Sequence, residues 1–200
     1  MDNTPKENIS QIMAVLSVNT KIHSHPRSTI IFLAEKCVLL HKGVVALCRQ
    51  RDNLVYGYYS APMIFGLNLS NLNPDLYIRP CGNIQCEIIE HSEVIKLADE
   101  HKIWKSIALF SMKMTSQALH YHNRLTATST RELIIACLMA LETEDDIVRS
   151  RIVAVDYIQS RTNLSRSAVM KLLAELKSYG GVTISKGLLV SLDKAVLDTI

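Results

Sequence analysis

The sequence predicts an α+β protein with an N-terminal helix and small β-barrel, a long linking helix, and a C-terminal winged helix-turn-helix. Three observations predict this class. Short runs rich in β-branched and aromatic residues, separated by turn residues, fill positions 28–91. Apolar residues at helical spacing follow over 92–125, and the order helix, tight turn, helix, hairpin follows over 152–192. We therefore divide the chain into 1–91, 92–125 and 126–200.

The first part is predicted to begin with a short amphipathic helix within residues 1–20. Its apolar residues recur at three- and four-residue spacing and share one face. They are Ile9, Ile12, Met13 and Leu16. Many short strands at regular spacing, as in the rest of this part, are typical of a small barrel or sandwich. The predicted strands are Thr29–Leu33, Cys37–Leu40, Val44–Cys48, Leu54–Tyr59, Leu76–Ile78 and Gln85–Ile89.

The linking helix is predicted to start at Ser92, which is a suitable N-cap with acidic Glu93 in the first turn. Its apolar residues alternate in steps of four and three, interrupted at Gln117, which is the spacing of a coiled-coil seam. The seam consists of Ile103, Ile107, Phe110, Met114 and Tyr121. We interpret it as a homodimer interface. The alternative is a helix that packs only on its own barrel.

Residues 126–130 form a polar break, and Thr130 is the predicted N-cap of the next helix, Arg131 to Leu141. The motif itself starts with a short helix from Val153 to Arg161 and a turn at 162–164. Asn163 suits that turn, because asparagine tolerates the left-handed conformation.

The second helix of the motif is predicted from Arg166 to Tyr179, capped by Ser165 and ended by Gly180-Gly181. Its inward residues are Val169, Leu172, Leu173 and Leu176. Two strands, Val182–Ser185 and Leu188–Leu192, then flank the turn Lys186-Gly187 and form the wing.

Positive charge gathers in this motif, although the whole chain carries a net charge of only +3. Residues 149–187 hold seven Lys and Arg against two acidic residues, a net charge of +5, whereas residues 1–148 have a net charge of −1. A local basic block is the electrostatic footprint of a nucleic-acid surface. The alternative is an ordinary solvated face.

The geometry of the motif assigns roles on double-stranded DNA. A recognition helix enters the major groove by its N-terminal end, and arginine there can bind guanine through two parallel hydrogen bonds. We expect Arg166 to read a base, Lys171 to meet a phosphate or a second base, and Lys186 to reach the flanking backbone. The full set of predicted DNA-binding residues is Thr162, Asn163, Ser165, Arg166, Ser167, Lys171 and Lys186. A winged helix used only for protein contacts is the alternative.

Other classes of protein are disfavoured. No apolar run is long enough for a membrane span, and residues 1–8 do not resemble a signal peptide, so we expect a cytoplasmic protein with no membrane partner. The five cysteines lack metal-site spacing, and His120 and His122 point apart on a helix, so we expect no metal and no cofactor. No nucleophile–base pair, phosphate loop or paired carboxylates indicate an enzyme.

These features resemble the CRP/FNR superfamily of bacterial regulators over nearly the whole chain. In that family a cyclic-nucleotide-binding-like barrel precedes a dimerisation helix and a winged helix-turn-helix. Leu40–Leu47 resembles its strand-glycine-strand hairpin, and Pro62–Leu67 resembles its "G-D-F-I-G-E" stretch. The resemblance implies a dimeric transcription regulator with RNA polymerase as a partner.

A narrower resemblance, strongest in the C-terminal third, is to the enterobacterial family named inhibitor of hydrogen peroxide resistance. It implies a role in oxidative-stress resistance. The residues that carry it are Arg149–Ile152, Tyr157–Gln159, Arg161–Thr162, Ser165–Ser167, Leu173–Leu176 and Ser185–Gly187.

The chain departs from the superfamily pattern in two places. Leu67 stands where the nucleotide pocket needs a glutamate, and Asn73–Leu76 replaces the arginine-serine pair that holds the cyclic phosphate. We therefore expect no cyclic-nucleotide binding. Gln159 stands where the first helix of the motif usually has a small residue, so we expect a different helix crossing.

The leading hypothesis is a dimeric DNA-binding regulator. The alternative is a sensor or scaffold whose barrel binds an effector or a protein and whose winged helix no longer reads sequence. A subsidiary hypothesis is a redox response through Cys81 and Cys86, which lie close together across a turn bounded by Pro80.

Overall fold

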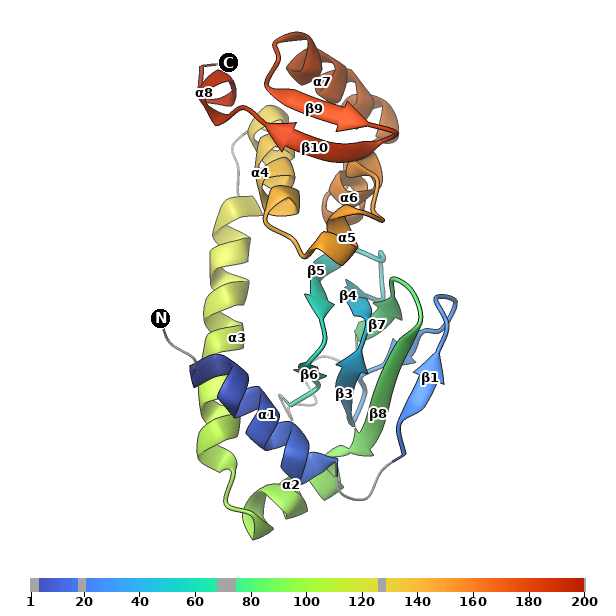
Figure 1. Ribbon diagram of the computed structural model, residues 1–200, viewed down its shortest axis with the longest axis vertical. Coiled ribbons are helices and arrows are strands. Elements are labelled where there is room, and N and C mark those ends of the chain that lie inside the picture. The colour runs from blue at the N-terminus through green and yellow to red at the C-terminus, as the bar shows by residue number, and fades with distance from the viewer. Residues whose placement is uncertain (1–3, 18–20, 68–74, 126–128, 200) are drawn as a thin grey trace. The chain divides into compact units, whose positions relative to one another are not determined.

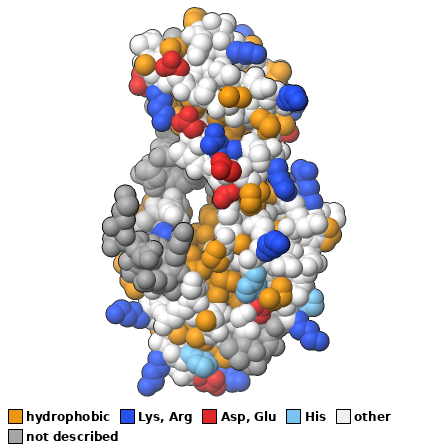
Figure 2. All heavy atoms as spheres, viewed as in Figure 1, with side chains coloured by type: hydrophobic (Ala, Val, Ile, Leu, Met, Phe, Trp, Pro, Cys, Tyr) orange, Lys and Arg blue, Asp and Glu red, His pale blue; other side chains and the backbone are white. Residues whose placement is uncertain are grey.

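The computed structural model describes residues 4–17, 21–67, 75–125 and 129–199, without the side chains of 4–7 and 120–125. The chain forms two compact units, residues 1–118 and 119–200 (Figure 1). Lys and Arg side chains are scattered over the visible surface of each (Figure 2).

The N-terminal unit is built on two antiparallel sheets, which confirms the predicted fold class. Among the described residues, the strand orders are β1-β8-β3-β6 and β2-β7-β4-β5. Apolar residues from both sheets, among them Leu40, Val45 and Ile78, form one buried cluster. The predicted barrel is therefore a pair of sheets around a shared core. The strands are β1 (His23–His25), β2 (Ile31–Phe32), β3 (Lys36–Lys42), β4 (Val44–Arg49), β5 (Val55–Ser60), β6 (Met63–Phe65), β7 (Leu76–Pro80) and β8 (Ile84–Glu90).

All six predicted strands are present, with shifted ends, and two further strands are not predicted. β1 is polar, and β6 is three residues long, so neither has the alternating pattern from which a strand is predicted. β6 nevertheless pairs with β3, and β1 pairs with β8. Long-range pairing rather than local propensity fixes these two strands.

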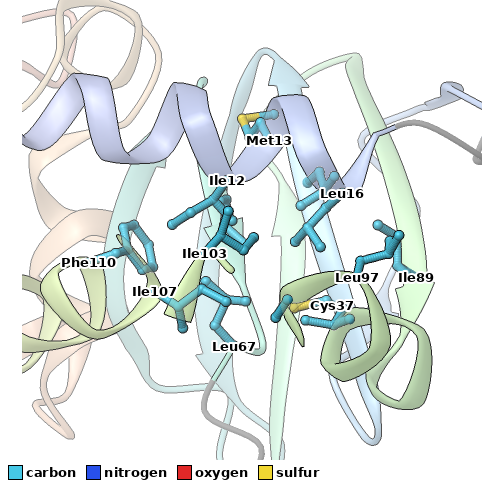
Figure 3. Close-up of a cluster of buried hydrophobic side chains, with 14 of the residues drawn as sticks. Ile12, Met13, Leu16, Cys37, Leu67, Ile89, Leu97, Ile103, Ile107 and Phe110 are labelled. Atoms are coloured by element: carbon cyan, nitrogen blue, oxygen red, sulfur yellow. The ribbon is translucent and has the colours of Figure 1, made fainter. Parts of the chain in front are cut away.

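The helix predicted near the N-terminus is α1 (Thr4–Leu16), and its four predicted apolar residues are all buried. They pack on residues from the sheet and from the two following helices, as Figure 3 shows. The hydrophobic face of α1 is therefore buried within the N-terminal unit.

The linking region is two helices, not the single helix expected from Ser92. The N-cap of α2 (His91–Glu100) is Glu90, two residues before the predicted cap Ser92, so the predicted cap is wrong. The chain then breaks at 101–103, where Lys102 has a positive φ of 54°. α3 (Trp104–Leu125) follows. Nothing in the sequence indicated the break, because lysine has no preference for the left-handed conformation.

Four of the five predicted seam residues face the core of the N-terminal unit, namely Ile103, just before α3, and Ile107, Phe110 and Met114 on α3. Ile103, Ile107 and Phe110 are 4–6% exposed and pack in the cluster that contains α1 (Figure 3). Met114 is partly buried against the same cluster. The side chain of Tyr121 lies outside the described part of the chain. The first three residues of the seam are thus buried against the same chain. This agrees with the alternative interpretation, in which the helix packs on its own barrel.

The C-terminal unit contains α4 (Thr130–Glu142), α5 (Asp146–Arg149), α6 (Ala154–Arg161), α7 (Arg166–Ser178), β9 (Val182–Ser185), β10 (Leu188–Leu192) and α8 (Lys194–Leu197). The N-cap of α4 is Ser129 rather than the predicted Thr130. Ser129 and Glu132 form a reciprocal capping box, which satisfies two backbone N–H groups at that end. Residues 126–128 of the predicted break at 126–130 lie outside the described residues.

Candidate nucleic-acid interface

Helix α7 is anchored by one face and exposes the other. Ser165 is its N-cap, as predicted, and its side chain accepts a hydrogen bond of 3.2 Å from the Ala168 backbone N–H. At the other end, Gly181 N–H donates to Leu176 and Gly180 N–H donates to Lys177, which is the Schellman pattern. Val169, Leu173 and Leu176 are buried, while Leu172 is half-buried.

The exposed face of α7 carries the predicted recognition residues together with one apolar residue. Arg166, Ser167 and Lys171 are all exposed. Met170 is also exposed, at 51% of its surface, one turn after Arg166. Met170 is not among the DNA-binding residues predicted from the sequence. The sequence pattern could have identified it, because the buried positions Val169, Leu173 and Leu176 place Met170 on the exposed side of the helix. An apolar side chain there suits a thymine methyl group.

The turn between α6 and α7 has a different role from the one expected. Thr162 is 7% exposed, and its hydroxyl donates a 2.8 Å hydrogen bond to the Ile158 carbonyl. That hydroxyl caps the C-terminus of α6, and the burial of Thr162 weighs against a contact with phosphate. Asn163 is exposed, but it is not among the described residues with positive φ, so the left-handed conformation expected for it is wrong.

Arg166 is exposed and held at one nitrogen by helix α6. Its Nη1 donates to Asp156 Oδ1 at 3.0 Å and to Gln159 Oε1 at 3.3 Å. The two side chains of the ion pair are 62% and 59% exposed. Gln159, singled out in the sequence as unusually large for its place, is half-buried and serves as the second acceptor.

One arginine of the basic block belongs to the core instead. Arg161 is 5% exposed, and its Nη2 lies 3.0 Å from Glu144 Oε1. Its guanidinium also stacks over the Tyr157 ring, 4.3 Å from the ring centroid. The +5 charge of the block therefore overstates its surface charge. Four basic side chains of the block are exposed without a described ion pair: Arg151, Lys171, Lys177 and Lys186.

The wing is as predicted. β9 and β10 are antiparallel, and the turn residues Lys186 and Gly187 have positive φ of 49° and 84°, as in a type I′ hairpin. Gly187 accepts a 2.9 Å hydrogen bond from the Ala154 backbone N–H, and a Cβ on Gly187 would lie 2.8 Å from Val153. The wing is thus attached to the start of α6, and Lys186 is exposed at its tip.

Leu67, which stands where the family's nucleotide pocket needs a glutamate, lies in the core of the N-terminal unit. Leu67 is 7% exposed and belongs to the cluster around α1 and α3. Asn73 and Pro74, two of the four residues of the predicted departure at 73–76, lie outside the described residues. Gly66 has a φ of 82°, and a Cβ there would lie 2.1 Å from the Lys36 carbonyl oxygen. Residue 67 is therefore directed into the core rather than toward a ligand.

The two candidate redox cysteines differ in environment. Cys86 is fully buried on β8, and burial raises its pKa to about 11. Cys81 is half-buried and packs against a different cluster, which contains Tyr77. None of the five cysteines, all of which lie in the described part of the chain, forms a disulfide. The Cys86 thiol is a poor nucleophile, because its raised pKa leaves little thiolate near neutral pH. The structure weighs against a switch that begins at Cys86.

Comparison with solved structures defines the architecture. The chain superposes on the c-di-GMP-responsive global regulator CLP of Xanthomonas campestris with a TM-score of 0.74 and 16% identity, over 92% of this chain and 99% of that one. A CRP-family transcriptional regulator from Thermus thermophilus gives 0.65 and 19%, over 88% and 95%. The chain has the fold of the CRP/FNR regulators.

Sequence comparison agrees with this fold. A family described as "Winged helix-turn-helix DNA binding" matches residues 130–196, from the start of α4 into α8. The protein named "Inhibitor of hydrogen peroxide resistance" from Escherichia coli K12 is 28% identical over 163 residues, which are 80% of this chain and 78% of that protein. The fold and the winged helix-turn-helix that the resemblance to the CRP/FNR superfamily implied are confirmed. None of the helices in the described part of the chain is long and apolar enough to cross a membrane.

Proposed function

We propose that this protein is a transcription regulator that binds specific sites on double-stranded DNA through α7. The observation that carries the proposal is the exposed N-terminal face of α7, with Arg166, Ser167, Met170 and Lys171 on one side and a buried apolar face on the other. Arg166 reads a guanine, Met170 contacts a thymine methyl group, and the exposed Lys186 of the wing contacts the phosphate backbone.

We also propose that the protein acts as a homodimer through the exposed face of α3 rather than through the buried seam. Leu109, Met112 and Leu119 are 40%, 66% and 60% exposed. Their separations of three and seven residues place them on one face of the helix. Symmetric half-sites require two recognition helices about 34 Å apart, which a dimer supplies.

The role in peroxide resistance comes from the relatives alone. The curated relatives are named for inhibition of hydrogen peroxide resistance. We propose that this chain controls genes of that response by DNA binding. If so, cells that produce wild-type protein in excess differ in peroxide survival from cells that produce Arg166→Ala, at equal protein level. Equal survival would contradict this part. RNA polymerase remains a partner implied by the resemblance.

DNA binding is tested by selecting bound fragments from a random-sequence library and titrating the selected site with salt. A regulator of this class gives an enriched motif with two-fold symmetry and an affinity that falls steeply with salt. The alternative, a sensor or scaffold, gives no enriched motif. An enriched motif without symmetry would support DNA binding and contradict the dimer.

A further inference from the structure

We propose that Asp156 is a positioning residue that holds Arg166 for contact with a base and discourages it from contacting phosphates. The proposal rests on the proposed function, since it concerns how α7 reads DNA. Asp156 is one of the two acidic residues in the basic block at 149–187 and is not among the DNA-binding residues predicted from the sequence.

One nitrogen of Arg166 donates to two acceptors on α6. Asp156 and Gln159 are three residues apart on α6, so they project from the same side of that helix. Both accept a hydrogen bond from Nη1 of Arg166, at 3.0 and 3.3 Å. Among the described residues, no hydrogen bond engages Nε or Nη2 of Arg166. That edge of the guanidinium therefore still offers the two parallel N–H donors that match guanine O6 and N7.

Holding the side chain in advance favours the specific complex. A free arginine has many rotamers and loses that freedom when it docks on a base edge. In this protein α6 has already restricted Arg166 before DNA arrives. The restraint benefits only a complex in which Arg166 keeps this orientation, which is the complex with the correct base.

The carboxylate acts on the competing contact. A phosphate is an anion, so Asp156 repels it, whereas a base edge carries no net charge. A contact of Arg166 with the DNA backbone must therefore either break the ion pair or bring two anions together. Asp156 therefore weakens contacts of Arg166 with phosphates, which occur on any sequence, more than it weakens the contact of Arg166 with a base.

The exposure of the pair makes this testable. The two side chains are 62% and 59% exposed, and exposed ion pairs contribute little to stability. Removing the carboxylate should therefore leave the C-terminal unit folded, which a thermal melt checks. Asp146→Asn is the matched control, because Asp146 also lies in the first turn of a helix and pairs with an arginine, Arg149, at 3.8 Å.

The experiment compares Asp156→Ala, Asp156→Asn and Asp146→Asn in the full chain, on a selected site and on unrelated DNA, across a salt series. For Asp156→Ala we expect a tighter complex with unrelated DNA and a salt slope steeper by about 0.9, the value of one added phosphate contact. We expect the preference at the base read by Arg166 to fall by about three- to tenfold. Asp156→Asn keeps an oxygen acceptor and should retain part of that preference. The control should change neither quantity.

A double variant separates positioning from general electrostatics. In the Arg166→Ala background, Asp156→Ala should have no further effect on base preference. The proposal is overturned if Asp156→Ala changes affinity for selected and unrelated DNA by the same factor, or if it alters base preference when Arg166 is absent. Wild-type protein without any sequence preference overturns the proposed function as well, and that result is visible before any variant is compared.

Discussion

Arg161 and Glu144 form an ion pair in which Nη2 and Oε1 are 3.0 Å apart and the side chains are only 3% and 17% exposed. Tyr157 donates a 2.7 Å hydrogen bond to the same carboxylate oxygen and lies under the guanidinium. The three residues tie the acidic segment after α4 to helix α6. The pair positions the helix that in turn supports α7.

Glu144→Ala should destabilise the C-terminal unit strongly, because it leaves the guanidinium of Arg161 buried without its counter-charge. We expect a loss of about 3–5 kcal/mol in the free energy of unfolding, measured by urea denaturation. Glu142→Ala is the control. Its Oε2 lies 3.3 Å from Nζ of Lys194, and the Lys194 side chain is 64% exposed. That change should cost at most about 1 kcal/mol. Equal effects of the two variants would contradict the role given to Arg161.

Thr162 should act in folding rather than in DNA contact. Thr162→Val keeps the shape but removes the hydroxyl that donates to Ile158. We expect a loss of about 1 kcal/mol in stability and an unchanged salt slope of DNA binding. A slope reduced by about one unit would restore Thr162 as a phosphate contact.

The dimer interface is tested on the exposed face of α3. Leu109→Asp combined with Met112→Asp should give folded monomers in sedimentation, because both side chains are exposed in the single chain. Ile107→Asp should instead unfold the N-terminal unit, since it places a charge in the core. Gln117→Asp, an exposed residue of the same helix away from that face, is the control. A double variant that stays dimeric contradicts the interface.

The cysteines should react in an order set by burial. Burial raises the pKa of Cys37 to about 12, and that of Cys137 and Cys86 to about 11, above the ordinary value of 9.0. The thiolate is therefore scarce below these pKa values. At pH 8 iodoacetamide should alkylate half-buried Cys81 first and leave these three intact until the protein unfolds. Mass spectrometry of digests measures the order, and early labelling of Cys86 would revive the redox hypothesis.

Local signals predicted the helix ends and the hairpin turn of the winged helix-turn-helix, whereas features that depend on packing between elements were not predicted. The Ser165 cap, the Gly180-Gly181 end and the Lys186-Gly187 turn each depend on a few adjacent residues, and all three are present. The burial of Arg161 and the hydrogen bonds from Arg166 to α6 depend on how α6 packs against its neighbours. Composition and residue spacing do not show that packing. The periodic apolar residues of the seam indicated that this side of the helix is covered. Periodicity alone does not show whether a second copy or the same chain covers it.

Whether Arg166 reads a base is tested by measuring the affinity of wild-type protein and Arg166→Ala for every single-base variant of a selected site. We expect Arg166→Ala to lose about 1–3 kcal/mol on the preferred site and to accept any base pair at one position. Lys186→Ala, in contrast, should weaken all sequences alike. The account is contradicted if Arg166→Ala lowers affinity uniformly and leaves the preferred sequence unchanged, because Arg166 would then be a phosphate contact.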